Sequence, residues 1–91
     1  MELAGLMVEQ AFTDCLPRET PLPFKVIKAH YTKRIKKESI AQAVVEIFDG
    51  EQAIVEVTAK TEIGWSWKIR WIKLGSDISY ENGKWIRVAI A

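Results

Sequence analysis

The stretch AQAVVEIFDGEQAIVEVTAK, residues 41–60, decides the fold of this 91-residue chain. Small and aliphatic residues occupy the odd positions from 41 to 47 and again from 53 to 59, and this period of two predicts two antiparallel strands joined by a tight turn. A two-residue Asp-Gly turn would pair odd positions with even ones and mix polar with apolar residues on each face. A three-residue loop that ends in a left-handed glycine pairs odd with odd. We therefore predict the loop Phe48-Asp49-Gly50.

The residues after this hairpin continue the antiparallel pattern. Bulky apolar residues alternate with polar ones, which predicts a third strand whose bulky side faces the core (Trp65, Trp67, Ile69 and Trp71). Beyond Gly75 the apolar positions change from odd to even, and a one-residue β-bulge at residues 75–77 would account for the change. A turn at Glu81-Asn82-Gly83 then leads to a last strand over residues 84–91, which completes a β-meander.

The N-terminal part follows helical spacing. Apolar residues recur every three or four positions over residues 2–15, which predicts a helix, and three prolines between residues 17 and 23 end it. Over residues 24–37 similar spacing favours a second helix (Phe24, Ile27, Tyr31 and Ile35). A strand over residues 24–37 separates polar from apolar residues less consistently, and it remains the alternative.

These elements predict one α+β domain over residues 1–91, with a helical part at 1–38 and the β-meander at 39–91. Hydrophobic residues make up 48% of the chain and charged residues 27%, as in ordinary folded domains. The small residues on the first two strands leave room for helices (Ala41, Ala43, Ala53 and Ala59). The expected architecture is one or two N-terminal helices packed on a four-stranded antiparallel meander.

Composition limits the compartment and the partners that we expect for the protein. The net charge is +1, so no strong overall field draws the chain to nucleic acid or to an anionic membrane. Cys15 is the single cysteine and forms no internal disulfide, which favours a reducing compartment. The N-terminus lacks the basic region of a signal peptide, and no apolar stretch approaches the roughly 20 residues that span a bilayer. We expect a cytoplasmic protein without membrane contact.

The face of the sheet opposite the helices mixes apolar with charged residues. Such a half-apolar face is often covered by a second copy of the chain or by another protein. The favoured hypothesis is therefore a non-catalytic binding or assembly domain that forms a homodimer through its open sheet face. The expected interface residues are Trp85, Arg87, Ile54, Ile72 and Leu74.

A second hypothesis comes from the basic segment 25–37. It contains six Lys or Arg residues and no acidic residue (Lys25, Lys28, Lys33, Arg34, Lys36 and Lys37). These cations could contact backbone phosphates, and tryptophans could stack on bases, as in a nucleic-acid-binding accessory protein. The opposing interpretation is a solvated helix face whose charge is balanced elsewhere in the chain.

A third hypothesis is a small enzyme with a cavity. Asp14, His30 and Tyr31 are the candidate acid-base groups, and they would have to converge in one pocket. One His and one Cys do not suffice for a metal site, and no glycine-rich loop is present to hold a phosphate. We therefore expect no metal and no cofactor, and we favour a protein that is not an enzyme.

Two short motifs resemble the nuclear transport factor 2-like and cystatin-like superfamily. GEQAIVEV (residues 50–57) resembles a strand motif of that group, and ENGKWI (residues 81–86) resembles its closing hairpin. The resemblance implies helices that precede and pack into a curved antiparallel sheet. Members include isomerases, dehydratases, transport and assembly adaptors and dimerising domains, so it implies a fold more than a function.

Overall fold

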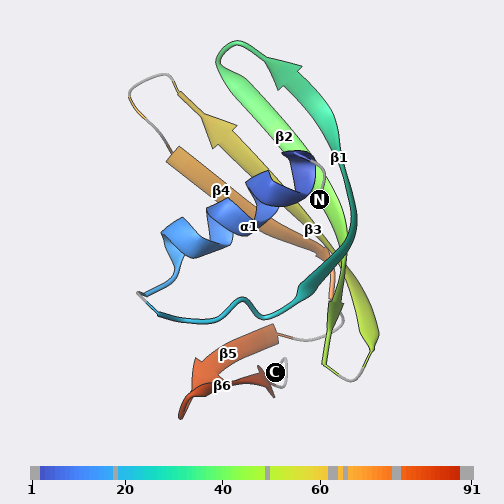
Figure 1. Cartoon of the computed structure of the whole chain (residues 1–91), viewed down its shortest axis with the longest axis vertical. Helices are drawn as coiled ribbons and strands as arrows, with labels where there is room; N and C mark the ends of the chain where they lie inside the picture. The colour runs from blue at the N-terminus through green and yellow to red at the C-terminus, as the bar shows by residue number, and fades with distance from the viewer. Residues whose placement is uncertain are drawn as a thin grey trace.

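The computed structural model describes residues 3–17, 19–48, 50–61, 64, 66–74 and 77–88. One helix precedes a series of antiparallel strands, so the predicted α+β class is confirmed. The sheet order is β1-β2-β3-β4, and β5 and β6 form a separate two-stranded sheet (Figure 1). The elements are α1 (Leu3–Cys15), β1 (Lys25–Ile35), β2 (Glu38–Ile47), β3 (Glu51–Lys60), β4 (Ser66–Lys73), β5 (Asp77–Glu81) and β6 (Lys84–Val88).

The hairpin of β2 and β3 has the predicted register. Ile47 lies opposite Glu51, and odd positions pair with odd positions along both strands, so the three-residue loop is confirmed. Gly50 has a φ of 84°, in the left-handed region that glycine adopts without steric cost. The Glu51 amide donates a hydrogen bond of 2.7 Å to the Phe48 carbonyl and closes the loop. Asp49 lies outside the described residues.

The predicted second helix is wrong, because residues 25–35 form strand β1. The strand pairs along β2, and Ala29 and Tyr31 lie opposite the alanines of its inner face. Two β-bulges, one at Ile27 and one at Thr32, each insert an extra residue and reverse the alternation. The apolar residues therefore recur at helix-like intervals although the backbone is extended. The helical part of the chain is α1 alone among the described residues.

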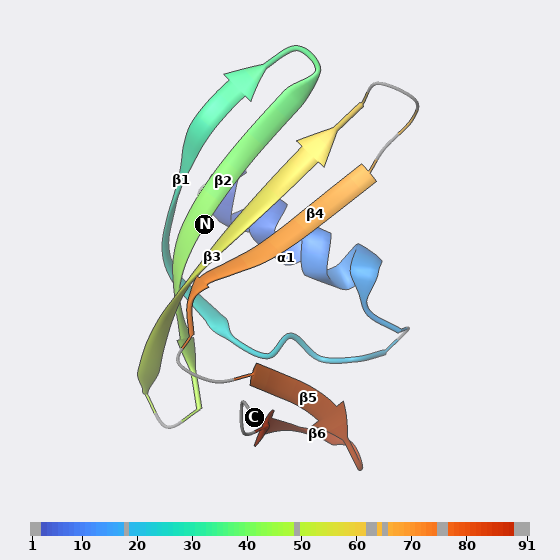
Figure 2. The same ribbon diagram turned by 180° about the vertical axis from the view of Figure 1, so that it is seen from behind.

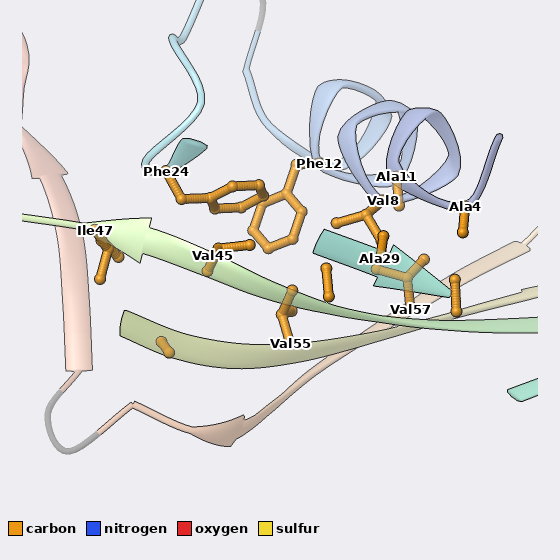
Figure 3. Packing of buried hydrophobic residues seen from close by; sticks show 13 residues of the cluster. Ala4, Val8, Ala11, Phe12, Phe24, Ala29, Val45, Ile47, Val55 and Val57 are labelled. Atoms are coloured by element: carbon orange, nitrogen blue, oxygen red, sulfur yellow. The ribbon is translucent and has the colours of Figure 1, made fainter. Parts of the chain in front are cut away.

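Helix α1 packs on one face of the main sheet (Figures 1 and 2). The predicted floor of small residues is confirmed, since the alanines of β2 and β3 that face α1 are all buried. Val8 and Ala11 of α1 are fully buried against this floor (Figure 3). Phe12 lies edge-on to Phe24 and to Trp71, with ring centroids 4.7 and 5.8 Å away. This aromatic cluster joins the helix, the segment before β1 and strand β4.

The predicted continuous meander is wrong at its C-terminal end. The third predicted strand ends at Lys73 as β4, and the chain then enters the separate β5–β6 hairpin. The β5–β6 hairpin has its own two faces, so its apolar residues need not continue the odd positions of β4. This explains why the apolar positions change from odd to even after β4. The turn at 81–83 is confirmed, with Asn82 and Gly83 at φ values of 53° and 79°. Trp65, Gly75 and Ser76, with the bulge expected there, and residues 89–91 lie outside the described residues.

In the described part of the chain, no helix has the length and apolarity needed to cross a membrane.

Candidate functional site

The outer face is the set of residues on β1–β4 that point away from α1. Strand register assigns seven cations and three carboxylates to it, whereas the whole chain has 13 Lys and Arg against 12 Asp and Glu. Positive charge is therefore concentrated on this side of the sheet. The cations are Lys25, Lys28, Lys33, Lys60, Lys68, Arg70 and Lys73, and the carboxylates are Glu38, Glu46 and Glu56.

A hydrogen-bonded row crosses the centre of the outer face. Gln42 donates to one carboxylate oxygen of Glu56 at 3.1 Å, and the Arg70 guanidinium binds the other at 3.2 Å. The Arg70 side chain is still 63% exposed, so the ion pair orients the guanidinium without covering it. Beside this row, Thr58 and Lys68 complete the lining of a shallow depression of about 220 Å³.

A second ion-pair group lies nearer the β1–β2 turn. Glu38 binds the ammonium groups of Lys33 at 2.7 Å and Lys60 at 3.5 Å. The hydrogen bond from Lys33, together with the charges of both lysines, lowers the pKa of the Glu38 carboxyl below its ordinary value. The carboxylate therefore holds two cations from different strands on the same face.

An apolar row separates cations on the opposite edges of the sheet. Lys28 lies opposite Val44, Val44 opposite Ile54, and Ile54 opposite Lys73. A small hollow of about 180 Å³ opens at this row. The two lysines are thus carried by β1 and β4, with aliphatic side chains between them.

The six cations predicted for nucleic-acid binding do not all lie on one surface. Lys25, Lys28 and Lys33 lie on the outer face, and Lys36 and Lys37 are exposed in the β1–β2 turn. Arg34 instead lies on the inner side, with its guanidinium 4.7 Å from the Tyr31 ring centroid. The outer face gains four cations that the basic segment does not contain (Lys60, Lys68, Arg70 and Lys73). In the sequence these four cations alternate with core residues along β3 and β4, and this alternation could have predicted that they point outward.

The five residues expected at a dimer interface do not share one surface. Ile54 is on the outer face, and Ile72 is the extra residue of a β-bulge in β4, where it is 43% exposed. Leu74 is partly buried against the hydrophobic core. The other two, Trp85 and Arg87, belong to the separate β5–β6 hairpin.

The hairpin residues make contacts within the chain. The Trp85 indole N–H donates a hydrogen bond of 2.8 Å to the Pro21 carbonyl, and its ring packs on Tyr80 with centroids 5.3 Å apart. Arg87 forms an ion pair with Glu51. These contacts attach the hairpin to the rest of the domain, so Trp85 is half-buried.

The candidate acid-base residues do not converge. Asp14 is at the end of α1 and accepts a hydrogen bond of 2.9 Å from the Trp67 indole on β4. Tyr31 is on β1, separated from β4 by β2 and β3, and His30 points to the opposite face of the sheet. Among the described residues, no group of three or more His, Cys, Asp or Glu side chains could hold a metal ion.

A groove that the sequence alone did not predict lies between α1 and β4. Its volume is about 560 Å³, and its lining is mainly apolar with polar groups from Gln10 and Asp14. Leu6 and Met7 form the helix side, and Trp67 forms the strand side. The helical spacing of residues 6, 10 and 14 puts them on one side of α1, but the sequence does not reveal which strand that side meets.

Comparisons of the chain with protein-family models, with curated proteins and with solved structures find no match. The resemblance to the nuclear transport factor 2-like and cystatin-like superfamily therefore stays a prediction.

Proposed function

We propose that the protein is a non-catalytic binding domain that holds a nucleic acid duplex by its phosphate backbone on the outer face. The observation that carries this proposal is the concentration of seven cations against three carboxylates on one side of a nearly neutral chain. Charge arranged in this way produces a local positive potential although the net charge is small.

The spacing of the cations suits a polyanion. Neighbouring strands are about 4.8 Å apart, and successive outward residues on a strand are about 7 Å apart. Lys68 and Arg70 are such successive residues, and Lys28 lies across the sheet on β1. Several phosphates along a backbone can therefore be contacted together, and each contact releases bound counterions.

The type of side chain on the outer face favours a duplex over a single strand. Proteins that bind single strands stack bases on aromatic side chains. On β4 the tryptophans Trp67 and Trp71 share the side of the core, and the outward residues of β1–β4 include no Phe, Tyr or Trp. Contacts from lysine to phosphate need no access to bases and do not depend on sequence.

The same charges count against a homodimer through this face. In a two-fold dimer the same surface patch meets itself, so cations would approach cations. Lys28, Lys68 and Lys73 form no ion pair within 4.0 Å among the described residues that could offset this repulsion. The outer face therefore fits an anionic partner better than a second copy of itself.

Titration of a fluorescent duplex of about 20 base pairs tests the proposal by anisotropy at several salt concentrations. Four phosphate contacts predict that affinity falls about 100-fold between roughly 50 and 200 mM salt. Lys28→Gln and Lys73→Gln, at opposite edges of the sheet, should each weaken binding and reduce the salt slope by about one.

Lys84→Gln is the matched control. Lys84 is exposed on β6, outside the outer face, and its replacement should leave binding unchanged. No binding at low salt, or equal losses in all three variants, would show that the outer face is not a nucleic-acid interface.

A further inference from the structure

The two edges of the main sheet differ. β1 has two bulges, which hinder the addition of another strand. β4 pairs with β3 without interruption from Ser66 to Trp71, and no described strand pairs with its other side. The edge of β4 is therefore the regular one that is open to another strand.

The groove described above lies beside this open edge. In Figures 1 and 2 the C-terminal end of α1 projects beyond β4, so the helix is not fully backed by the sheet. Leu6 on the helix is 48% exposed, and Met7 and Trp67 are partly buried. A strand added to β4 would lie under this part of α1, beside Trp67 and the end of the groove that Gln10 and Asp14 line.

We propose that the β4 edge and the α1–β4 groove bind an extended peptide segment of a partner protein as a fifth strand. The segment alternates apolar side chains, which enter the groove, with acidic side chains, which lie beside Lys68 and Arg70. Main-chain hydrogen bonds to an open edge supply affinity in this mode, and pockets for alternate side chains supply specificity.

The alternation follows from the two sides of β4. Trp67, Ile69 and Trp71 are on the side of α1, whereas Lys68 and Arg70 are on the outer face. In adjacent strands, directly opposed side chains interact, and opposite charges stabilise the pair. An acidic residue in the groove would instead approach Asp14, so acidic residues are accepted on one side only.

A second copy of this chain does not fit the β4 edge. Antiparallel pairing of β4 with itself around Ile69 would put Lys68 opposite Arg70 of the second copy. Like charges opposite each other destabilise a strand pair. Charge complementarity therefore selects an acidic partner strand.

The test uses capped synthetic peptides of eight residues, the length of β4. A peptide that alternates Val with Glu should bind at least about tenfold more tightly than one that alternates Val with Lys. On binding, amides of β4 should gain protection from hydrogen exchange, and amides of β1 should not. Failure of the Val-Glu peptide to bind at about millimolar concentration would overturn the proposal.

N-methylation of the peptide distinguishes strand addition from charge attraction alone. Alternate amides of an added strand point toward β4 and toward solvent. Of two Val-Glu peptides methylated at alternate residues, one should lose binding and the other should retain it. Equal binding of both would show that no fifth strand forms.

Substitutions locate the site. Leu6→Glu should weaken binding of the Val-Glu peptide about tenfold or more, because it introduces a negative charge into the groove. Leu3→Glu is the matched control, since Leu3 is 61% exposed on the same helix but does not line the groove. Equal losses in both variants would overturn the proposed site.

If the Leu6→Glu variant does not fold, the Lys68→Glu variant provides an independent test. The side chain of Lys68 is exposed, and its reversal should favour the Val-Lys peptide over the Val-Glu peptide. An unchanged preference would overturn the charge argument. Lys28→Gln, on the distant β1 strand, should leave peptide binding unchanged, so the outcome is separable from that for nucleic acid.

Discussion

Replacement of Phe12 by alanine tests how α1 is held on the sheet. The ring is only 6% exposed and lies edge-on to two other aromatic rings, at interplanar angles of 85° to Phe24 and 66° to Trp71. These three residues come from α1, the segment before β1 and β4. Loss of the Phe12 ring should therefore weaken three parts of the fold together.

The expected loss is large relative to the stability of the domain. Removal of a buried Phe side chain costs about 3–5 kcal/mol, and each edge-to-face contact contributes about 0.5–1.5 kcal/mol beyond the buried area. A domain of this size has a free energy of unfolding of about 5–15 kcal/mol. We expect Phe12→Ala to lower that free energy by about 4 kcal/mol.

Urea denaturation followed by far-ultraviolet circular dichroism measures the loss. With a slope of about 1.5 kcal/mol per molar urea, the midpoint should fall by about 2.7 M. Thr13→Ala is the control, because Thr13 is exposed and its hydroxyl donates only to the Glu9 carbonyl one turn earlier. That variant should stay within about 0.5 kcal/mol of the original protein. A loss below about 1.5 kcal/mol for Phe12→Ala, at unchanged slope, would show that the Phe12 ring does not hold α1 on the sheet.

Two further predictions concern polar contacts. Trp85→Phe keeps an aromatic ring but removes the donor to the Pro21 carbonyl, so the β5–β6 hairpin should lose about 1 kcal/mol of local stability. Faster hydrogen exchange in the hairpin, with β2 and β3 unchanged, is the expected result, and identical exchange rates would contradict it. Because the pKa of Glu38 is lowered, its ionised form stabilises the fold above the ordinary carboxyl pKa, and this stability is lost as pH falls through the lower folded value. Glu38→Gln should flatten the acid side of the dependence of thermal midpoint on pH, and an unchanged profile would count against the contact with Lys33.

The hairpin of β2 and β3 was predictable from the sequence because nothing interrupts its alternation. Pairing of odd with odd positions required a loop of odd length, and Gly50 supplied the left-handed residue that such a loop uses. β1 was not predictable in the same way. The extra residues Ile27 and Thr32 restart the alternation twice within one strand, and the resulting spacing imitates a helix.

The surfaces were less predictable than the strands. Lys28 and Lys68 are far apart in the chain, and only the register of four strands puts them on one face. The contact that Trp85 makes was unpredictable for a related reason. Its indole donates to a backbone carbonyl 64 residues away. Every residue has a backbone carbonyl, so the sequence does not show which one accepts this hydrogen bond.

The bulges of β1 also limit how far assembly can proceed. A sheet with two regular edges can accept a strand on each side, and repeated additions lead to fibrils. Here the bulges at Ile27 and Thr32 interrupt the β1 edge, so the domain can extend a sheet from its β4 edge only. The domain would thus cap one end of a sheet and would not serve as the repeating unit of a fibril.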